Sequence, residues 1–413
     1  MFRIAILVDL ELSEKSGGHV KFWERICSSL KNEKLDCNLE IFFLGKFANT
    51  INVSKNIKFR IQKPIVSSRI LKIIGIDADY TDLFPFNLRL FFQLRSFDVI
   101  HTTDQLFSMS KTAIIASRFW RIPLTTSYHT DAPSYSRYYI KKIITKFPKF
   151  ISRFLIDKVK LPKKIELSQR RKILKYFKKS NFALANNSIG NQKFSSKEKK
   201  ENNIIELSRG IEKEIFKEKK INKRMLLKKL KIPLNDKIIF FCGRIHELKG
   251  ALLLSEIHAS LKKTGHNLTT ILSGENFHGE LCKQKGGDKL IILNYLSPKE
   301  VAKFMNVCDL FVLPSRFETG PQVVLEAKSC NAVCVVSPDG GGKAIKKNFF
   351  DGIIVKNYRL VDWTAMISNL LKNPKKIKSI KTNIRNQKDI ITWREVFFDF
   401  FYNNWEKLHK KNE

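Results

Sequence analysis

Short apolar runs alternate with helical patterns along most of the chain, and this alternation restricts the fold more than any other feature. Between two of the runs, residues 251–261 form an amphipathic pattern typical of a helix that stops at Gly265. Strands separated by helices form parallel, doubly wound sheets. A chain of 413 residues has the length of two such domains. The predicted strands are 3–8, 98–101, 124–128, 238–242, 269–272, 290–293, 310–313 and 333–336.

Two glutamates eight positions apart, Glu318 and Glu326, follow one of these predicted strands. Pro321 suits the first position of a helix, and Asn331 suits the left-handed conformation that closes one. Glu318 then lies in the loop before the helix, and Glu326 lies in its second turn. Carboxylates accept hydrogen bonds from sugar hydroxyls, and helix N-termini attract phosphates. The segment therefore offers partners for both kinds of group.

The segment 314–327, PSRFETGPQVVLEA, resembles the retaining nucleotide-sugar glycosyltransferases of family 4. The resemblance implies the GT-B fold, in which two Rossmann-like doubly wound domains face a cleft and a C-terminal helix returns to the first domain. We expect an acceptor-side domain over residues 1–204 and a nucleotide-sugar-binding domain over 205–390. Residues 391–413 are the expected returning helix, because apolar residues from Trp393 onward follow one helical face.

The resemblance also implies roles for charged residues of the second half. Glu318 would bind hydroxyls of the donor sugar near the reacting carbon and is the first catalytic candidate. Glu326 would hold the ribose of the nucleotide. Arg244 and Lys249 follow the predicted strand 238–242, and both would neutralise the leaving diphosphate. A surface arginine and lysine, common in so basic a chain, are the alternative for this pair.

Small residues complete the expected donor site. Thr319 or Gly320 would cap the helix, and their backbone amides would meet sugar and phosphate. The family has an aromatic residue and then glycine after Glu-Thr, whereas this chain has Gly320 and Pro321, so one amide donor is lost. Gly341 lies in a glycine-rich turn that resembles the lining of the donor pocket. A plain flexible turn is the alternative there.

The first half supplies fewer candidates. Gly17 and Gly18 separate the first strand from a helical pattern, where the resemblance implies a loop that approaches the diphosphate. His129 follows the predicted strand 124–128, at the sheet edge that binds ligands in such folds. It is the second catalytic candidate and would bind the sugar or orient the acceptor. His101 ends another strand and ranks below it.

No metal or cofactor is implied. The triplet 77–79, Asp-Ala-Asp, has the pattern that binds metal in the other major glycosyltransferase fold, but no clear strand precedes it, so we interpret it as a loop. Seven scattered cysteines lack zinc-site spacing and indicate a reducing compartment. The donor, a UDP- or GDP-hexose, would be a substrate.

Positive charge dominates the composition, with 76 Lys and Arg against 39 Asp and Glu and a formal net charge of +37. Such a chain attracts polyanions, although a compositional bias of the source explains the excess equally well. Residues 135–160 combine basic and aromatic residues around an apolar face, typical of a helix in an anionic membrane interface. The alternative is a domain helix that packs this face on the sheet. No run reaches membrane-spanning length, so we expect a cytoplasmic protein or a peripheral one at the inner face of the cytoplasmic membrane.

The leading hypothesis is a retaining, metal-independent hexosyltransferase that acts on a membrane lipid or lipid-linked glycan. A soluble polysaccharide or lipopolysaccharide acceptor is the alternative within the same chemistry. A basic nucleic-acid-binding protein is the alternative of another class, although the sequence holds no recognised nucleic-acid-binding module. A GT-B relative with altered chemistry, such as an epimerase or a disabled transferase, is a further one.

Overall fold

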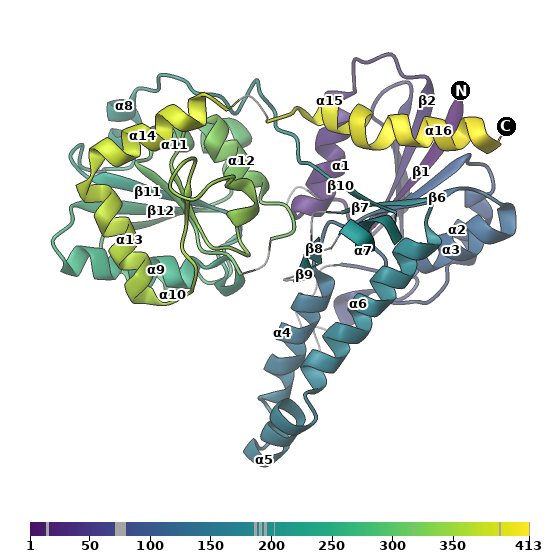
Figure 1. Ribbon diagram of the computed structural model, residues 1–413, viewed down its shortest axis with the longest axis horizontal. Coiled ribbons are helices and arrows are strands. Elements are labelled where there is room, and N and C mark those ends of the chain that lie inside the picture. The colour runs from purple at the N-terminus through teal and green to yellow at the C-terminus, as the bar shows by residue number, and fades with distance from the viewer. Residues whose placement is uncertain are drawn as a thin grey trace. The chain divides into compact units, whose positions relative to one another are not determined.

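The computed structural model describes residues 1–13, 16–70, 80–185, 188–189, 192–193, 196–201, 203–316, 318–387 and 390–412. The triplet 77–79 lies outside the described residues. The chain forms two compact units (Figure 1). Unit 1 comprises Met1–Ser208 and Trp393–Glu413, and unit 2 comprises Arg209–Thr392.

Unit 1 is built on an eight-stranded sheet of order β10-β7-β6-β5-β1-β2-β4-β3, parallel except for the edge strand β3. The order reverses between β1 and β5, so loops after these two strands diverge to opposite sides of the sheet. Its strands are β1 (Phe2–Glu11), β2 (Cys37–Leu44), β3 (Asn49–Asn52), β4 (Ile57–Gln62), β5 (Val99–Thr102), β6 (Leu124–Ser127), β7 (Phe182–Ala185) and β10 (Ile204–Glu206). A separate two-stranded ribbon is formed by β8 (Ser188–Ile189) and β9 (Gln192–Lys193).

The helices of unit 1 come from both ends of the chain. The first group is α1 (Gly18–Ser29), α2 (Leu88–Leu94), α3 (Ser108–Trp120), α4 (Ala132–Ile144), α5 (Lys149–Arg153), the π-helical segment η2 (Phe154–Lys158), α6 (Leu161–Lys179) and α7 (Ser196–Glu201). The second group is α15 (Trp393–Val396), the π-helical segment η5 (Phe397–Tyr402) and α16 (Asn403–Asn412).

The C-terminal helices complete the core of unit 1. Trp393, Phe401 and Trp405 are buried, as the helical period of apolar residues predicts. The Trp405 indole nitrogen donates a hydrogen bond to the Thr125 hydroxyl at 3.0 Å. On the surface, Arg394 forms an ion pair at 2.8 Å with Glu33, which follows α1.

Unit 2 is built on a six-stranded parallel sheet of order β13-β12-β11-β14-β15-β16. Its strands are β11 (Lys237–Cys242), β12 (Leu268–Ser273), β13 (Leu290–Leu293), β14 (Leu310–Leu313), β15 (Cys334–Val336) and β16 (Ile353–Ile354). Its helices are α8 (Lys223–Lys229), η3 (Glu247–Lys249), α9 (Ala251–Lys263), α10 (Gly279–Gly286), α11 (Pro298–Val307), α12 (Gln322–Ser329), η4 (Gly342–Ala344), α13 (Leu360–Lys372) and α14 (Pro374–Arg385).

The predicted strands all appear, each within two residues at either end except β1, which extends three residues further to Glu11. Continuous apolar runs marked them because a central parallel strand is buried on both faces. The sequence did not reveal β2, β3, β4, β7, β8, β9, β10 or β16, which are short or interrupted by polar residues. The predicted class, an α/β protein with two parallel sheets, is confirmed.

Candidate active site

The strand order of unit 2 reverses between β11 and β14. In open parallel sheets, ligands bind beyond the carboxyl ends of the strands that flank such a reversal. Arg244 and Lys249 follow β11, and Glu318 follows β14. Three of the predicted site residues therefore come from the two loops where this topology places a ligand.

Backbone contacts hold these two loops together. The Arg316 amide donates to the Leu248 carbonyl at 3.0 Å, and the Ser315 hydroxyl reaches the same oxygen at 3.4 Å. Gly250 has a left-handed conformation, with φ +79°, and a Cβ there would collide with the Pro314 carbonyl. Only glycine fits a position that requires both this φ and this close approach.

The result is an ion pair between the two loops. The Lys249 Nζ lies 2.6 Å from the Glu318 Oε1, and the two side chains are 16% and 17% exposed. The Ser315 hydroxyl donates to the same carboxylate oxygen at 3.1 Å. A cation and a carboxylate are thus held side by side at the sheet edge, where the first suits phosphate and the second suits sugar hydroxyls.

The loop after β15 supports the same edge. The Glu318 amide donates to the Asp339 carbonyl at 3.0 Å, and the Ser337 hydroxyl donates to the Ser315 carbonyl. Gly341 donates its amide to the Ser337 carbonyl at 3.0 Å. Burial raises the pKa of the Asp339 carboxyl, and nearby Lys343 opposes that rise. Gly341 therefore shapes a tight turn beneath the Glu318 loop.

The start of α12 differs from the prediction. Pro321 is the N-cap and not the first helical residue, so neither Thr319 nor Gly320 is the cap. With φ −75° and ψ 67°, Pro321 is the centre of an inverse γ-turn, closed by the Gln322 amide and the Gly320 carbonyl at 2.7 Å. This ψ is not helical, so the helix begins one residue later.

Glu326 occupies the second turn of α12, as predicted, and its side chain is buried. The side-chain Nε2 of Gln322 donates to the Glu326 Oε1 at 3.2 Å and to the Gly210 carbonyl at 2.7 Å. Asn331 has φ +59° just after the helix, which confirms its predicted left-handed conformation. Gln322 thereby ties the start of unit 2 to the helix that carries Glu326.

Arg209 is a residue of this site that sequence reasoning missed. It is half-buried, and a Cβ on Gly320 would collide with its guanidinium. The absence of a side chain at Gly320 thus allows a further cation to lie against the loop that carries Glu318. Its only signal in the sequence is a place in the segment that opens the second half, more than a hundred residues earlier.

The corresponding edge of unit 1 holds a chain of hydrogen-bonded imidazoles and hydroxyls. The His101 imidazole bonds to the Thr125 hydroxyl through Nδ1 and to the Ser127 hydroxyl through Nε2, both at 2.8 Å. The Ser127 hydroxyl also bonds to the His129 Nε2 at 2.7 Å. Burial lowers the pKa of His101 to about 3, so this imidazole is neutral at physiological pH.

His129 lies at the outer end of this chain and is buried among aromatic rings. Its ring stacks on His19 with centroids 4.7 Å apart and contacts Phe22 at 4.5 Å. His19 directly follows Gly17, the N-cap of α1, and Gly18, its first residue. The structure therefore brings the glycine pair and His129 to one edge, and His19 is a neighbour that the sequence did not reveal.

Within the described residues, no cluster of three or more His, Cys, Asp or Glu side chains has the arrangement of a metal site. All seven cysteines are free thiols. Burial raises the pKa of Cys330 to about 12, which fits a packing role. Metal independence stays a prediction.

Comparison with known proteins identifies the second half. Residues 222–387 match the family Glycosyl transferases group 1. Unit 2 is therefore similar to the group 1 glycosyl transferases over most of its length. The match covers β11 to β15 and α12, and with them Arg244, Lys249, Glu318 and Glu326.

Curated relatives resemble part of the chain. The D-inositol 3-phosphate glycosyltransferase of Segniliparus rotundus is 25% identical over 155 residues, which are 35% of this chain and 34% of that protein. The N,N'-diacetylbacillosaminyl-diphospho-undecaprenol alpha-1,3-N-acetylgalactosaminyltransferase of Campylobacter jejuni is 37% identical over 84 residues, 20% of this chain and 22% of that protein. The chain thus spans about a third or less of the length of these two relatives.

Solved structures resemble the whole chain. The crystal structure of Anabaena HepE in complex with UDP and glucose has a TM-score of 0.67 at 14% identity, covering 98% of this chain and 100% of that one. WaaG, a glycosyltransferase involved in lipopolysaccharide biosynthesis, has a TM-score of 0.59 at 12% identity, with 99% of each chain covered. The chain therefore has the GT-B fold.

Proposed function

We propose that the protein transfers a hexose from a nucleotide-diphosphate sugar to a hydroxyl acceptor, with retention of anomeric configuration. The observation that carries the proposal is the ion pair of Lys249 and Glu318 at the β11–β14 reversal. The family match of residues 222–387 supports it. So does the likeness to a structure in complex with UDP-glucose, which has a TM-score of 0.62 at 13% identity.

In this proposal, the donor binds at the carboxyl edge of the unit 2 sheet. Lys249 and Arg244 neutralise the diphosphate, whose charge grows as the glycosidic bond breaks. Glu318 accepts hydrogen bonds from the sugar, and Glu326 accepts them from the ribose. Arg209, against Gly320, adds positive charge beside the same loop.

The proposal gives smaller roles to the remaining candidates. Thr319 and Gly320 line the sugar side of the Glu318 loop, and Gly341 shapes the turn beneath it. In unit 1, His129 contacts the acceptor or the transferred sugar. A Cβ at Gly17 or Gly18 would meet no atom within 4 Å, so this backbone leaves room for substrate phosphate.

For the acceptor, we propose a lipid or lipid-linked glycan at the inner face of the cytoplasmic membrane. The net charge of +37 favours an anionic surface, and relatives such as the one from Campylobacter jejuni are named for diphospho-undecaprenol acceptors. Among the residues described, no helix has the length and apolarity needed to cross a bilayer. A soluble polysaccharide or lipopolysaccharide acceptor is the second candidate, supported by the likeness to WaaG.

Donor binding by the full-length protein tests the proposal. We expect one nucleotide sugar from a UDP and GDP panel to raise the melting temperature, since saturation at a hundred times Kd stabilises by about 2.7 kcal/mol. Lys249→Met should remove most of this shift, and Lys263→Met, at an exposed lysine of α9, should not.

Further measurements separate the remaining hypotheses on stereochemistry, protein class and acceptor. The coupling constant of the new anomeric proton, measured by NMR, reports whether configuration is retained. A panel without any thermal shift, combined with binding of oligonucleotides, would overturn the transferase proposal in favour of a nucleic-acid-binding protein. Vesicles that raise the transfer rate would favour the lipid acceptor over the soluble one.

A further inference from the structure

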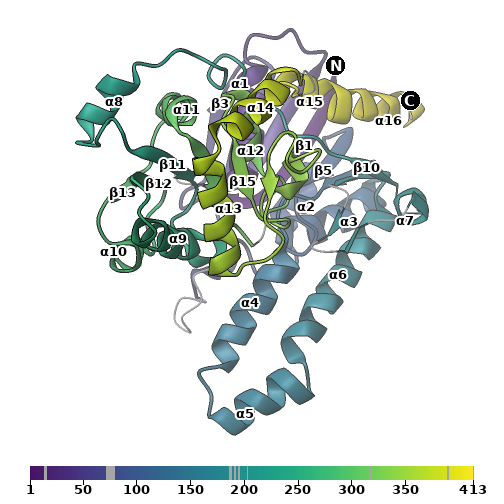
Figure 2. The same ribbon diagram turned by 60° about the vertical axis from the view of Figure 1, so that its left-hand side comes forward.

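The helices α4, α5 and α6 of unit 1 form a hairpin that projects from the sheet (Figures 1 and 2). Its α4 and α6 arms lie side by side, and α5 lies at the far end. Residues 145–158, which we call the hairpin tip, carry three exposed phenylalanines. Phe147 is 50% exposed, Phe150 is 74% exposed and Phe154 is 58% exposed.

Positive charge surrounds these rings. Residues 141–165 contain nine Lys or Arg and one acidic residue, Asp157. Lys146, Lys149 and Arg153 alternate with the phenylalanines along the tip, and all three are exposed. Exposed aromatic rings within a basic rim have the composition of a surface that meets a bilayer interface.

The structure divides residues 135–160 into separate elements, and the expected contact with a membrane stays a prediction. These residues are not one amphipathic helix, because α4 ends at Ile144 and α5 begins after Pro148. Nor is their whole apolar face packed away, because Ile144 is buried whereas the three phenylalanines are exposed. The α6 arm packs along α4, and η2 contacts both arms, whereas the three phenylalanines of the tip stay exposed.

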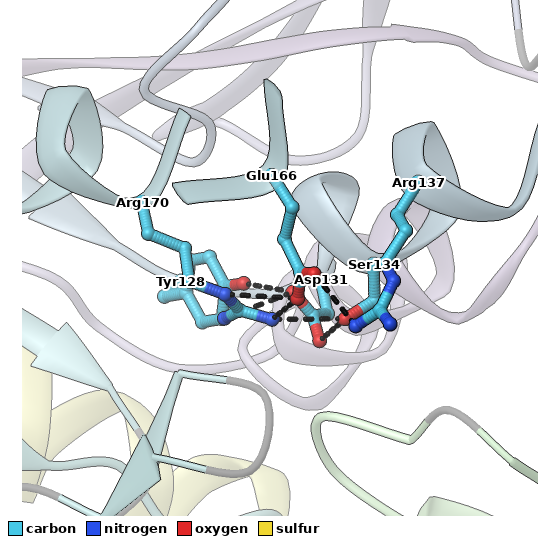
Figure 3. A network of polar contacts seen from close by, with 6 residues as sticks. All are labelled: Tyr128, Asp131, Ser134, Arg137, Glu166 and Arg170. Atoms are coloured by element: carbon cyan, nitrogen blue, oxygen red, sulfur yellow. Dashed lines mark hydrogen bonds and ion pairs between the residues drawn. The ribbon is translucent and has the colours of Figure 1, made fainter. Parts of the chain in front are cut away.

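A polar network fixes the base of the hairpin (Figure 3). Asp131, at the N-cap of α4, accepts hydrogen bonds from Tyr128 at 3.0 Å and from Ser134 at 2.6 Å. Arg170 of α6 donates to Ser134 at 2.9 Å and to Glu166 at 2.7 Å. Burial works against the charge of Arg170, but Asp131 and Glu166 raise its pKa.

Because Tyr128 directly follows β6, this network joins the hairpin to the edge that carries His129. The arms therefore hold the tip at a set position relative to that edge. A surface that bound the tip would also be held at a set distance from His129.

We propose that the hairpin tip inserts its phenylalanines into the headgroup region of an anionic phospholipid bilayer. The rings enter the boundary between headgroups and acyl chains, and the lysines and Arg153 pair with lipid phosphates. A bilayer fits better than a nucleic acid because the partly exposed Ile151 and Leu155 extend the apolar surface with side chains that do not stack on bases. Docking on the bilayer does not depend on the proposed function. The further claim that docking brings the enzyme to a lipid acceptor rests on that function.

Vesicle flotation of the full-length protein tests this proposal, with phosphatidylcholine alone and with equal parts of phosphatidylcholine and phosphatidylglycerol. We expect the protein to float with the anionic vesicles. Changing Lys146, Lys149 and Arg153 together to Ser should lower the partition coefficient by about a hundredfold. Changing Phe147, Phe150 and Phe154 together to Ser should lower it by at least about tenfold.

Matched controls carry comparable substitutions to Ser elsewhere on the surface. Lys372, Lys375 and Lys378, exposed in and near α14, are changed together to Ser, and so are the exposed Phe47, Phe119 and Met225. Both control proteins should bind the anionic vesicles within about twofold of the original protein. Circular dichroism and melting temperature establish that each variant is folded.

The absence of flotation would overturn the proposal, and so would unchanged flotation of the phenylalanine variant. A third contrary result is a protein that does not bind vesicles but binds an oligonucleotide, with that binding lost in the tip variants. The thermal shift with nucleotide sugars, measured in solution on the same variants, separates the two proposals. Tip variants that keep this shift but lose the vesicles support docking. A protein that binds vesicles through its tip without any donor shift loses the transferase proposal alone.

Discussion

Units 1 and 2 arrange their parallel strands in the same order around a central reversal, yet their carboxyl edges differ in chemistry. The edge of unit 2 carries the Lys249–Glu318 ion pair, with Arg209 close to the same loop. The edge of unit 1 carries His101, Ser127 and neighbouring hydroxyls in a neutral chain. The fold sets where a site lies, and the side chains set which substrate group it can receive.

The two edges also differ in how they are held together. In unit 2, amide-to-carbonyl contacts and the close approach of Gly250 to Pro314 join the loops. In unit 1, hydroxyls, imidazoles and aromatic rings of buried side chains do so. Backbone changes should therefore damage unit 2 most, and side-chain changes should damage unit 1 most.

The charged edge gives the largest expected effect. Glu318→Gln should lower the transfer rate by about a hundred- to a thousandfold, because loss of one charged group at a reacting centre costs that much. Glu326→Gln should mainly weaken nucleotide binding, seen as a smaller thermal shift with UDP or GDP alone. Equal rates for Glu318→Gln and the original protein would show that the charge of Glu318 has no part in the transfer.

A pair of glycines sharpens the backbone side of the contrast. Gly250→Ala should destabilise unit 2 by about 3 kcal/mol or more, because its Cβ meets Pro314 in addition to the strain of a positive φ. Gly265 has φ +81° but open space around it, so Gly265→Ala should cost only about 1 kcal/mol. Urea unfolding measures both, and equal costs would show that the loop contact contributes little.

Two arginines form ion pairs with Glu166, and substitutions of each test the side-chain contacts of unit 1. Arg170→Met should cost about 2–3 kcal/mol, because it leaves the buried Asp131 and Glu166 without their shared cation. Arg137, which contacts the same glutamate at 3.0 Å but is about half exposed, should cost less than about 1 kcal/mol when changed to Met. A reversed order would place the anchor of the hairpin elsewhere.

The neutral chain of unit 1 predicts a pH dependence. Folded His101 binds a proton only below about pH 3, whereas the unfolded chain binds one near 6.5. The unfolded state therefore binds more protons between these values, so the free energy of unfolding falls as pH falls. Relative to His101→Gln, the original protein should lose up to about 1.4 kcal/mol per pH unit below about 6.5.

Urea unfolding from about pH 8 to pH 4 measures this difference. Asp9, whose pKa burial raises to about 7, titrates in both proteins and cancels in the subtraction. A difference that stays flat with pH would mean that His101 is protonated inside the folded protein.

The sequence predicted what depends on neighbours along the chain. Buried runs such as 310–313 gave the strands, and the common edge of parallel strands then brought Lys249 and Glu318 together. Contacts between distant segments were not predictable in this way. Arg209 and Gly320 are more than a hundred residues apart in the sequence, and so are His19 and His129.

The sequence predicted local structure wrongly where one residue type favours two different conformations. Proline has the same φ in a first helical turn and in an inverse γ-turn, and only ψ of Pro321 separates them. The hairpin failed for a related reason. The sequence pattern cannot tell that Ile144 is buried and that Phe150 is exposed.

The return of the chain to unit 1 affects its synthesis. Trp405, which bonds to Thr125 and packs against His101, leaves the ribosome after all of unit 2. Unit 2 can therefore fold while translation continues, whereas the sheet of unit 1 waits for its last aromatic partners. A nascent chain stalled before residue 393 would hold one finished unit and one with an uncovered apolar face, which is the form that a chaperone would bind.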